Sequence, residues 1–118
     1  MEGPEQSWRN ALAEGRFLLP RDKATGAYFF PPRVVAPGRG NDWEWVEASG
    51  QGTVHSVSVV HPRPPELPYA VVLVDLAEGP RLMSQVDGIN PEEVRIGMAV
   101  TARIDRDGGE AVLRFYPA

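Results

Sequence analysis

The chain has 118 residues and no cysteine, which allows one domain with a small appendage and excludes disulfides, thiolate catalysis and cysteine-ligated metal. Residues 1–40 carry six Lys or Arg and four acidic residues (net +2), whereas residues 41–118 carry six Arg and twelve acidic residues (net −6), a poor surface for a polyanion. No apolar run reaches the roughly 18 residues of a membrane span, and the acidic segment 1–5 differs from the basic start of a signal peptide, so we expect a cytoplasmic protein.

The first predicted element is a short helix over residues 5–14. Trp8, Ala11 and Leu12 recur at helical spacing and form one apolar stripe, and Gly15 is suited to end the helix. A helix of this length is not stable alone, so the stripe must pack on a surface. That surface is either the chain's own β domain or a partner subunit, and the pattern leaves both open.

Residues 20–40 form two glycine-ended turns on either side of an aromatic and proline-rich segment, 28–33. The pattern after Gly40 is that of a strand, with Trp43 and Trp45 on one face. Gly50 and Gly52 then interrupt the alternation, which indicates a bulge or bend within one long first strand that runs on to residue 61.

The rest of the chain reads as further strands separated by turns. Strands are expected over 69–76, 81–86, 99–105 and 110–116, with a short helix after 90. Asn90 is suited to be the N-cap of that helix, Pro91 its first residue and Glu93 its capping-box residue. Three strands, a helix and two strands predict a mainly β protein whose fold is the five-stranded OB-fold barrel.

Several phrases of the sequence occur in order at the spacing of one known family. Residues 20–40 fit the frame C-x-x-C-G, F-P-P-R, C-P-x-C-G without its cysteines. The barrel phrases are Gly50-Gln51-Gly52-Thr53-Val54, Pro68-Tyr69, Leu76-Ala77-Glu78-Gly79-Pro80-Arg81-Leu82, Arg95-Ile96-Gly97-Met98-Ala99-Val100 and Phe115-Tyr116-Pro117-Ala118. The chain resembles, over almost its whole length, the zinc-ribbon/OB-fold proteins, long labelled a domain of unknown function, that accompany thiolases and ketosynthase-like enzymes in acyl-CoA metabolism.

The resemblance implies a zinc ribbon whose ligands are lost. The family's four ligand positions are occupied here by Asp22, Thr25, Ala36 and Arg39. A methyl group and a guanidinium cannot ligate zinc, so we expect no zinc and a ribbon shaped by the packing of its aromatic residues. The alternative is that this segment is an ordinary loop rich in proline and glycine.

The resemblance also implies an N-terminal helix and degenerate ribbon in residues 1–40, an OB-fold barrel in residues 41–118, and a role in a hetero-oligomer. That role is a non-catalytic accessory subunit that binds a thiolase, acyltransferase or aldolase/hydratase in lipid, steroid or polyketide metabolism and supports its acyl-CoA site. The candidate partner-interface residues are Trp8, Leu12, Tyr28, Phe29, Phe30, Pro31 and Pro32. Arg33 and Arg39 are candidates to contact coenzyme A phosphates of an acyl-CoA shared with the partner, with a solvated loop as the alternative.

No catalytic or metal-binding set is evident in the sequence. His55 and His61 share one face of the predicted first strand, but no third ligand is placed beside them. Two rival functions remain open: a free-standing OB-fold binder of single-stranded nucleic acid, which the acidic barrel disfavours, and a small enzyme that uses His55 or His61.

Overall fold

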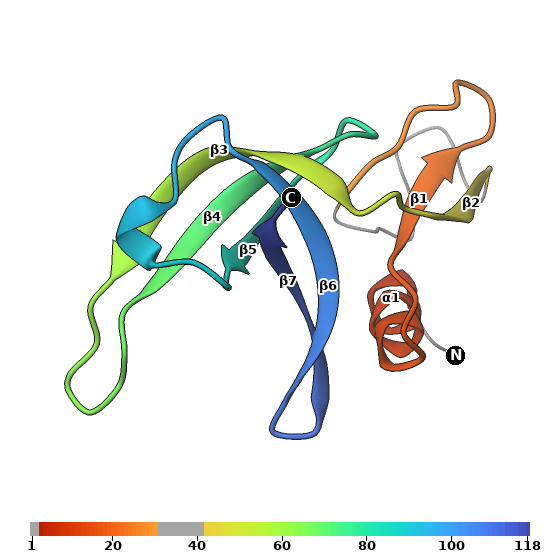
Figure 1. Ribbon diagram of the computed structural model, residues 1–118. Helices are drawn as coiled ribbons and strands as arrows, with labels where there is room; N and C mark the ends of the chain where they lie inside the picture. Colours follow the sequence, from red (N-terminus) through yellow and green to blue (C-terminus); the bar gives the residue numbers. More distant parts are fainter. Residues whose placement is uncertain (1–2, 31–41) are drawn as a thin grey trace.

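The computed structural model describes residues 3–30 and 42–118, and Figure 1 shows their arrangement. In this part of the chain, one helix, α1 (Pro4–Ala13), precedes a two-stranded antiparallel sheet of β1 (Leu18–Asp22) and β2 (Trp43–Glu47). We call this pair the ribbon sheet. α1 is too short to cross a membrane, and the described residues contain no longer apolar helix.

A closed barrel of five strands follows in the order β3-β4-β5-β7-β6. Its elements are β3 (Gln51–Val60), β4 (Tyr69–Leu76), β5 (Arg81–Val86), the 3-10 turn η1 (Pro91–Glu93), β6 (Ala99–Asp107) and β7 (Glu110–Pro117). Three strands, a short helical turn and two strands are the OB-fold arrangement, so the predicted mainly β fold is confirmed.

The predicted long first strand is wrong, because the structure divides it into β2 and β3. Gly50 has a φ of +81°, outside the extended region, and its carbonyl accepts a hydrogen bond from the Ala102 N–H at 2.6 Å. β2 pairs with β1, whereas β3 pairs with β4 and β6. Gly52 lies where β3 meets both barrel neighbours, and a Cβ there would come within 2.5 Å of Val74 Cγ1.

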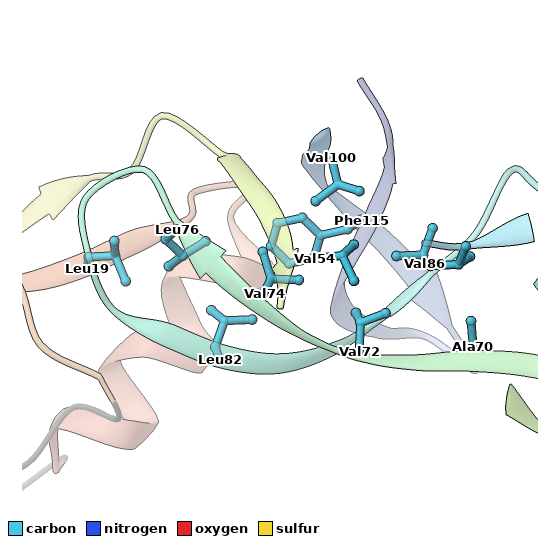
Figure 2. Close-up of a cluster of buried hydrophobic side chains, with 11 residues drawn as sticks. Leu19, Val54, Ala70, Val72, Val74, Leu76, Leu82, Val86, Val100 and Phe115 are labelled. Carbon is cyan, nitrogen blue, oxygen red and sulfur yellow. The ribbon is translucent and has the colours of Figure 1, made fainter. Parts of the chain in front are cut away.

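The core of the barrel is one cluster of buried side chains, and Figure 2 shows how they point toward one another. Phe115 of β7 is 0% exposed and pairs with Val86 of β5 across the parallel junction that closes the barrel. Leu19 of β1 is also 0% exposed and belongs to the same cluster, so the ribbon sheet shares its core with the barrel. The other members are Val54, Ala70, Val72, Val74, Leu76, Leu82, Val94 and Val100.

α1 packs within the chain, against β1 and β7. Leu12 is 3% exposed and Ala11 is 5% exposed, so the apolar stripe predicted from the sequence is buried here. The indole Nε1 of Trp8 donates to the Leu18 carbonyl at 2.9 Å, and Arg106 of β6 donates to the Ala13 carbonyl at the end of the helix at 2.8 Å. The helix is therefore fixed to both the ribbon sheet and the barrel.

The predicted helix start after β5 is a single turn. The side chain of Asn90 accepts a hydrogen bond from the Glu92 N–H at 3.0 Å, so it is the N-cap as predicted. The element ends after three residues because Val94 is extended, with a ψ of 128°.

Candidate functional site

Three aromatic rings lie in a row on one face of the ribbon sheet. The ring centroids of Phe29 and Trp43 are 6.0 Å apart, and those of Trp43 and Trp45 are 5.1 Å apart, both with edge-to-face geometry. We call these three residues the aromatic row. The antiparallel register places Trp43 opposite Asp22 and Trp45 opposite Pro20, and the Phe29 N–H donates to the Pro20 carbonyl at 3.0 Å. All three rings are only half-buried in this chain.

The other predicted interface residues that the structure describes lie toward the barrel. Tyr28 and Phe30 pack against the barrel core, and the ring of Phe30 contacts that of Trp8 at a centroid distance of 5.4 Å. Leu12 lies on the buried face of α1. These side chains hold α1 and the ribbon sheet on the barrel, and partner contact by them stays a prediction.

Four of the predicted site residues, Pro31, Pro32, Arg33 and Arg39, lie outside the described residues. Their contact with a partner or with coenzyme A stays a prediction.

Sequence reasoning missed Trp43 and Trp45 as members of this site. Their alternation predicts one face of the first barrel strand, and this gives no reason to place them beside Phe29. The pairing of β2 with β1, which are twenty residues apart in the sequence, brings Trp43 and Trp45 to the side of Phe29.

The first turn of the ribbon does not offer a zinc site. Asp22 is 7% exposed, and its Oδ1 accepts hydrogen bonds from the N–H groups of Ala24 and Thr25. Thr25 Oγ1 accepts one from the Ala27 N–H at 3.2 Å. Among the residues that the structure describes, no three His, Cys, Asp or Glu side chains are grouped for a metal ion. One carboxylate and one hydroxyl, both engaged by the turn, are not the donor set of structural zinc.

His55 in β3 and His61, the residue after β3 ends, lie beside two different surface carboxylates. His55 Nδ1 is 3.4 Å from Asp75 Oδ2, and His61 Nε2 is 3.4 Å from Glu92 Oε1. Arg81 Nε donates to Asp75 Oδ1 at 2.6 Å, so the carboxylate beside His55 is already held by a guanidinium. These contacts do not form a nucleophile–base pair.

The pKa of Asp75 is lowered, first by the hydrogen bond from Arg81 and further by the charges of Arg81 and His55. A carboxyl group with a depressed folded pKa contributes stability that is fully present above its unfolded pKa of about 3.9 and is lost as the pH falls through the folded value. We therefore expect Asp75→Asn to be less stable than the parent at pH 6 and this difference to shrink at pH 3. Urea unfolding at both pH values measures it, and an equal difference at the two would contradict the assignment.

A hollow of about 460 Å³ lies between the segments that flank the ribbon sheet, which contribute Gly15, Phe17 and residues 48–50, and strands β6 and β7 of the barrel. Phe17, Ile104 and Leu113 are apolar residues of its lining, and Arg103 and Arg106 are the charged ones. The guanidinium of Arg103 lies over the ring of Tyr116, and that of Arg106 donates to the Ala13 carbonyl. Its volume is in the range of small-molecule sites.

Comparison with known proteins identifies both parts of the chain. The family model described as the C-terminal OB-fold domain of ChsH2 matches residues 45–105, and the model described as the rubredoxin-like zinc ribbon domain of ChsH2 matches residues 9–36. The chain is 34% identical over 119 residues to a DUF35 domain-containing scaffold protein of Methanocaldococcus jannaschii, with 93% of this chain and 84% of the relative covered.

Two further relatives are named as parts of enzymes. The chain is 41% identical over 97 residues to a probable enoyl-CoA hydratase alpha subunit of Thermomonospora curvata. The aligned stretch covers 79% of this chain but only 30% of that protein. A solved structure described as "Ltp2-ChsH2(DUF35) aldolase" matches with a TM-score of 0.85 at 35% identity, over 99% of this chain and 96% of the other. The resemblance found in the sequence is confirmed by these matches, and the chain belongs to the DUF35 family of zinc-ribbon/OB-fold proteins.

Proposed function

We propose that the chain is a non-catalytic accessory subunit that binds an enzyme acting on acyl-CoA thioesters and supports the acyl-CoA site of that enzyme. The observation that carries the proposal is the likeness, over 99% of the chain, to a DUF35 chain described as part of an aldolase. The relative named as a hydratase alpha subunit supports the same class of partner. We favour a hydratase or aldolase as the partner, with a thiolase or an acyltransferase as the outcomes that the experiment below distinguishes.

The described side chains support a binding role. The aromatic row presents three half-buried rings on one sheet face, and aromatic residues are enriched in protein interfaces. Neither His55 nor His61 lies in an arrangement that suits general base or nucleophilic catalysis. We therefore place the partner on the ribbon sheet and the chemistry in the partner.

The hollow beside the ribbon sheet supports a contact with the substrate. Apolar walls suit an acyl or pantetheine chain, and guanidinium groups suit phosphate or carboxylate. Arg103 and Arg106 thereby join Arg33 and Arg39 as candidate coenzyme A contacts.

Co-expression with acyl-CoA enzymes encoded beside its gene tests the proposal. We expect a stable hetero-oligomer in size-exclusion chromatography with light scattering, and a partner whose turnover of acyl-CoA rises when this chain is present. Hydration, retro-aldol, thiolase and acyltransfer assays of the complex identify the class. A lone monomer that shifts labelled oligonucleotides would favour the nucleic-acid reading, and turnover by the isolated chain that His55→Ala or His61→Ala abolishes would favour the enzyme.

Trp43→Ala is expected to weaken the complex about 10- to 100-fold in Kd, because truncation of a central aromatic residue commonly removes an interface hot spot. Isothermal titration with the purified partner measures the loss. Leu67→Ala is the matched control, because Leu67 is 80% exposed but lies in the loop that joins β3 to β4, at the other end of the molecule from the ribbon sheet (Figure 1). A loss with Leu67→Ala and none with Trp43→Ala would move the interface to the barrel end.

A further inference from the structure

Two side chains of the first ribbon turn, Asp22 and Thr25, accept hydrogen bonds from amides of that turn. These are the two positions of the turn that the family pattern gives to zinc ligands. We propose that Asp22 takes over the ordering role of the metal in this turn. Its carboxylate satisfies the backbone N–H groups of Ala24 and Thr25 and so makes residues 22–27 independent of zinc. The proposal follows from the mismatch between a zinc-ribbon frame and the donor set present.

The carboxylate of Asp22 points into its own turn. Its Oδ1 accepts from the Ala24 N–H at 2.8 Å and from the Thr25 N–H at 3.3 Å, which is the geometry by which Asp stabilises turns. Hydrogen bonds to an ionised acceptor are stronger than those between neutral groups. Asp22 is 7% exposed, whereas Ala24 and Thr25 are exposed, so the acceptor side of these bonds is the buried one.

The second ligand position serves the same turn. Thr25 Oγ1 accepts from the Ala27 N–H at 3.2 Å. Both oxygen-bearing side chains at the family's ligand positions in this turn therefore bind backbone amides. A metal at this turn would meet one carboxylate and one hydroxyl, and Oδ1 and Oγ1 of these already accept from amides.

The backbone closes the turn around the two side chains. The Asp22 N–H donates to the Ala27 carbonyl at 2.8 Å, and the Gly26 N–H donates to the Asp22 carbonyl at 2.8 Å. Gly26 has a φ of +75°, the left-handed conformation that glycine adopts without a steric cost. The turn is therefore a closed set of hydrogen bonds.

This turn sets the position of the aromatic row. Asp22 is the last residue of β1 and lies opposite Trp43 in the register, and the Lys23 N–H donates to the Asp42 carbonyl at 3.1 Å. On the proposed function, a turn closed by Asp22 therefore holds the partner-facing rings in place without metal. The turn itself is tested in the isolated chain, so a failure to find a partner enzyme leaves the test unaffected.

Amide hydrogen exchange followed by NMR on the full chain tests the proposal. In Asp22→Ala we expect exchange of the Ala24 and Thr25 amides to accelerate about tenfold or more, with the β4 amides unchanged. Asp22→Asn is the matched control, since its Oδ1 can still accept, and exchange at both amides should stay within about threefold of the parent. Excess EDTA or added zinc should change neither the exchange nor the melting temperature, and elemental analysis should find no stoichiometric zinc.

Unchanged exchange at Ala24 and Thr25 in Asp22→Ala would overturn the proposal. So would an EDTA-induced acceleration in the parent chain, or one equivalent of tightly bound zinc. If Asp22→Ala does not fold, addition of EDTA to the parent chain decides: unchanged exchange at Ala24 and Thr25 supports a turn ordered without metal, and accelerated exchange overturns it.

Discussion

Phe115→Ala is expected to lower the free energy of unfolding by about 3–5 kcal/mol, the usual cost of removing a buried aromatic side chain. Phe115 is 0% exposed and lies at the junction where β7 meets β5 and β6. A small domain has about 5–15 kcal/mol in total, so this one substitution removes a large share of the stability. Urea titration followed by circular dichroism measures the change.

Met83→Ala is the matched control for the core. Met83 lies on the neighbouring strand β5 but is 71% exposed, so its truncation should change the stability by less than about 0.5 kcal/mol. A loss below about 1 kcal/mol in Phe115→Ala would mean that the ring is not the centre of the packed core.

Leu12→Ala should cost the isolated chain about 2–4 kcal/mol, because Leu12 is 3% exposed in the monomer and its truncation leaves a cavity under α1. This variant tests whether the apolar stripe of α1 packs on this chain or on a partner, which the sequence alone leaves open. Urea unfolding of the chain without any partner measures the effect.

Glu5→Ala on the same helix serves as the control. Glu5 forms an exposed ion pair with Arg9, which is worth no more than about 0.5 kcal/mol. Leu12→Ala and Glu5→Ala could leave the isolated chain equally stable while only Leu12→Ala prevents assembly with an enzyme. That result would mean that Leu12 contacts the partner and does not stabilise this chain.

The barrel could be predicted from the sequence because its strands carry local signals. Residues 69–76 and 81–86 were predicted at the bounds found for β4 and β5, from an apolar run and from turn residues that flank it. Asn90 and Pro91 predict the start of the short element between β5 and β6. These patterns act over a few residues, which is the range that a single sequence reveals.

β1 could not be predicted, because its order comes from pairing with a distant segment. Pro20 lies in the middle of this strand and cannot donate a ladder hydrogen bond, so the local pattern argues against a strand. Its register with Trp45 and the burial of Leu19 in the barrel core override that local signal. The division of the predicted first strand at Gly50 has the same origin, because β2 pairs with the distant β1 and not with the barrel strands.

The candidate site was predicted in part. The aromatic segment that begins at Tyr28 was recognised from its spacing, and Phe29 does lie in the half-buried aromatic row. Which aromatic rings face the barrel depends on tertiary packing, so Tyr28 and Phe30 could not be separated from Phe29 by sequence alone.

The anchoring of α1 has a consequence for how the chain is made. Arg106, whose guanidinium donates to the carbonyl at the end of the helix, comes 93 residues after Ala13, and β7, one of the two strands that α1 packs against, follows later still. A ten-residue helix is not stable alone, so while the ribosome is still adding β3 to β6 the segment has no finished surface to pack on. Contacts this far apart also slow folding. The face of α1 that packs on the barrel therefore lacks its full cover until β7 is made, and a product that stops short of β7 leaves this apolar surface of the helix exposed to aggregation.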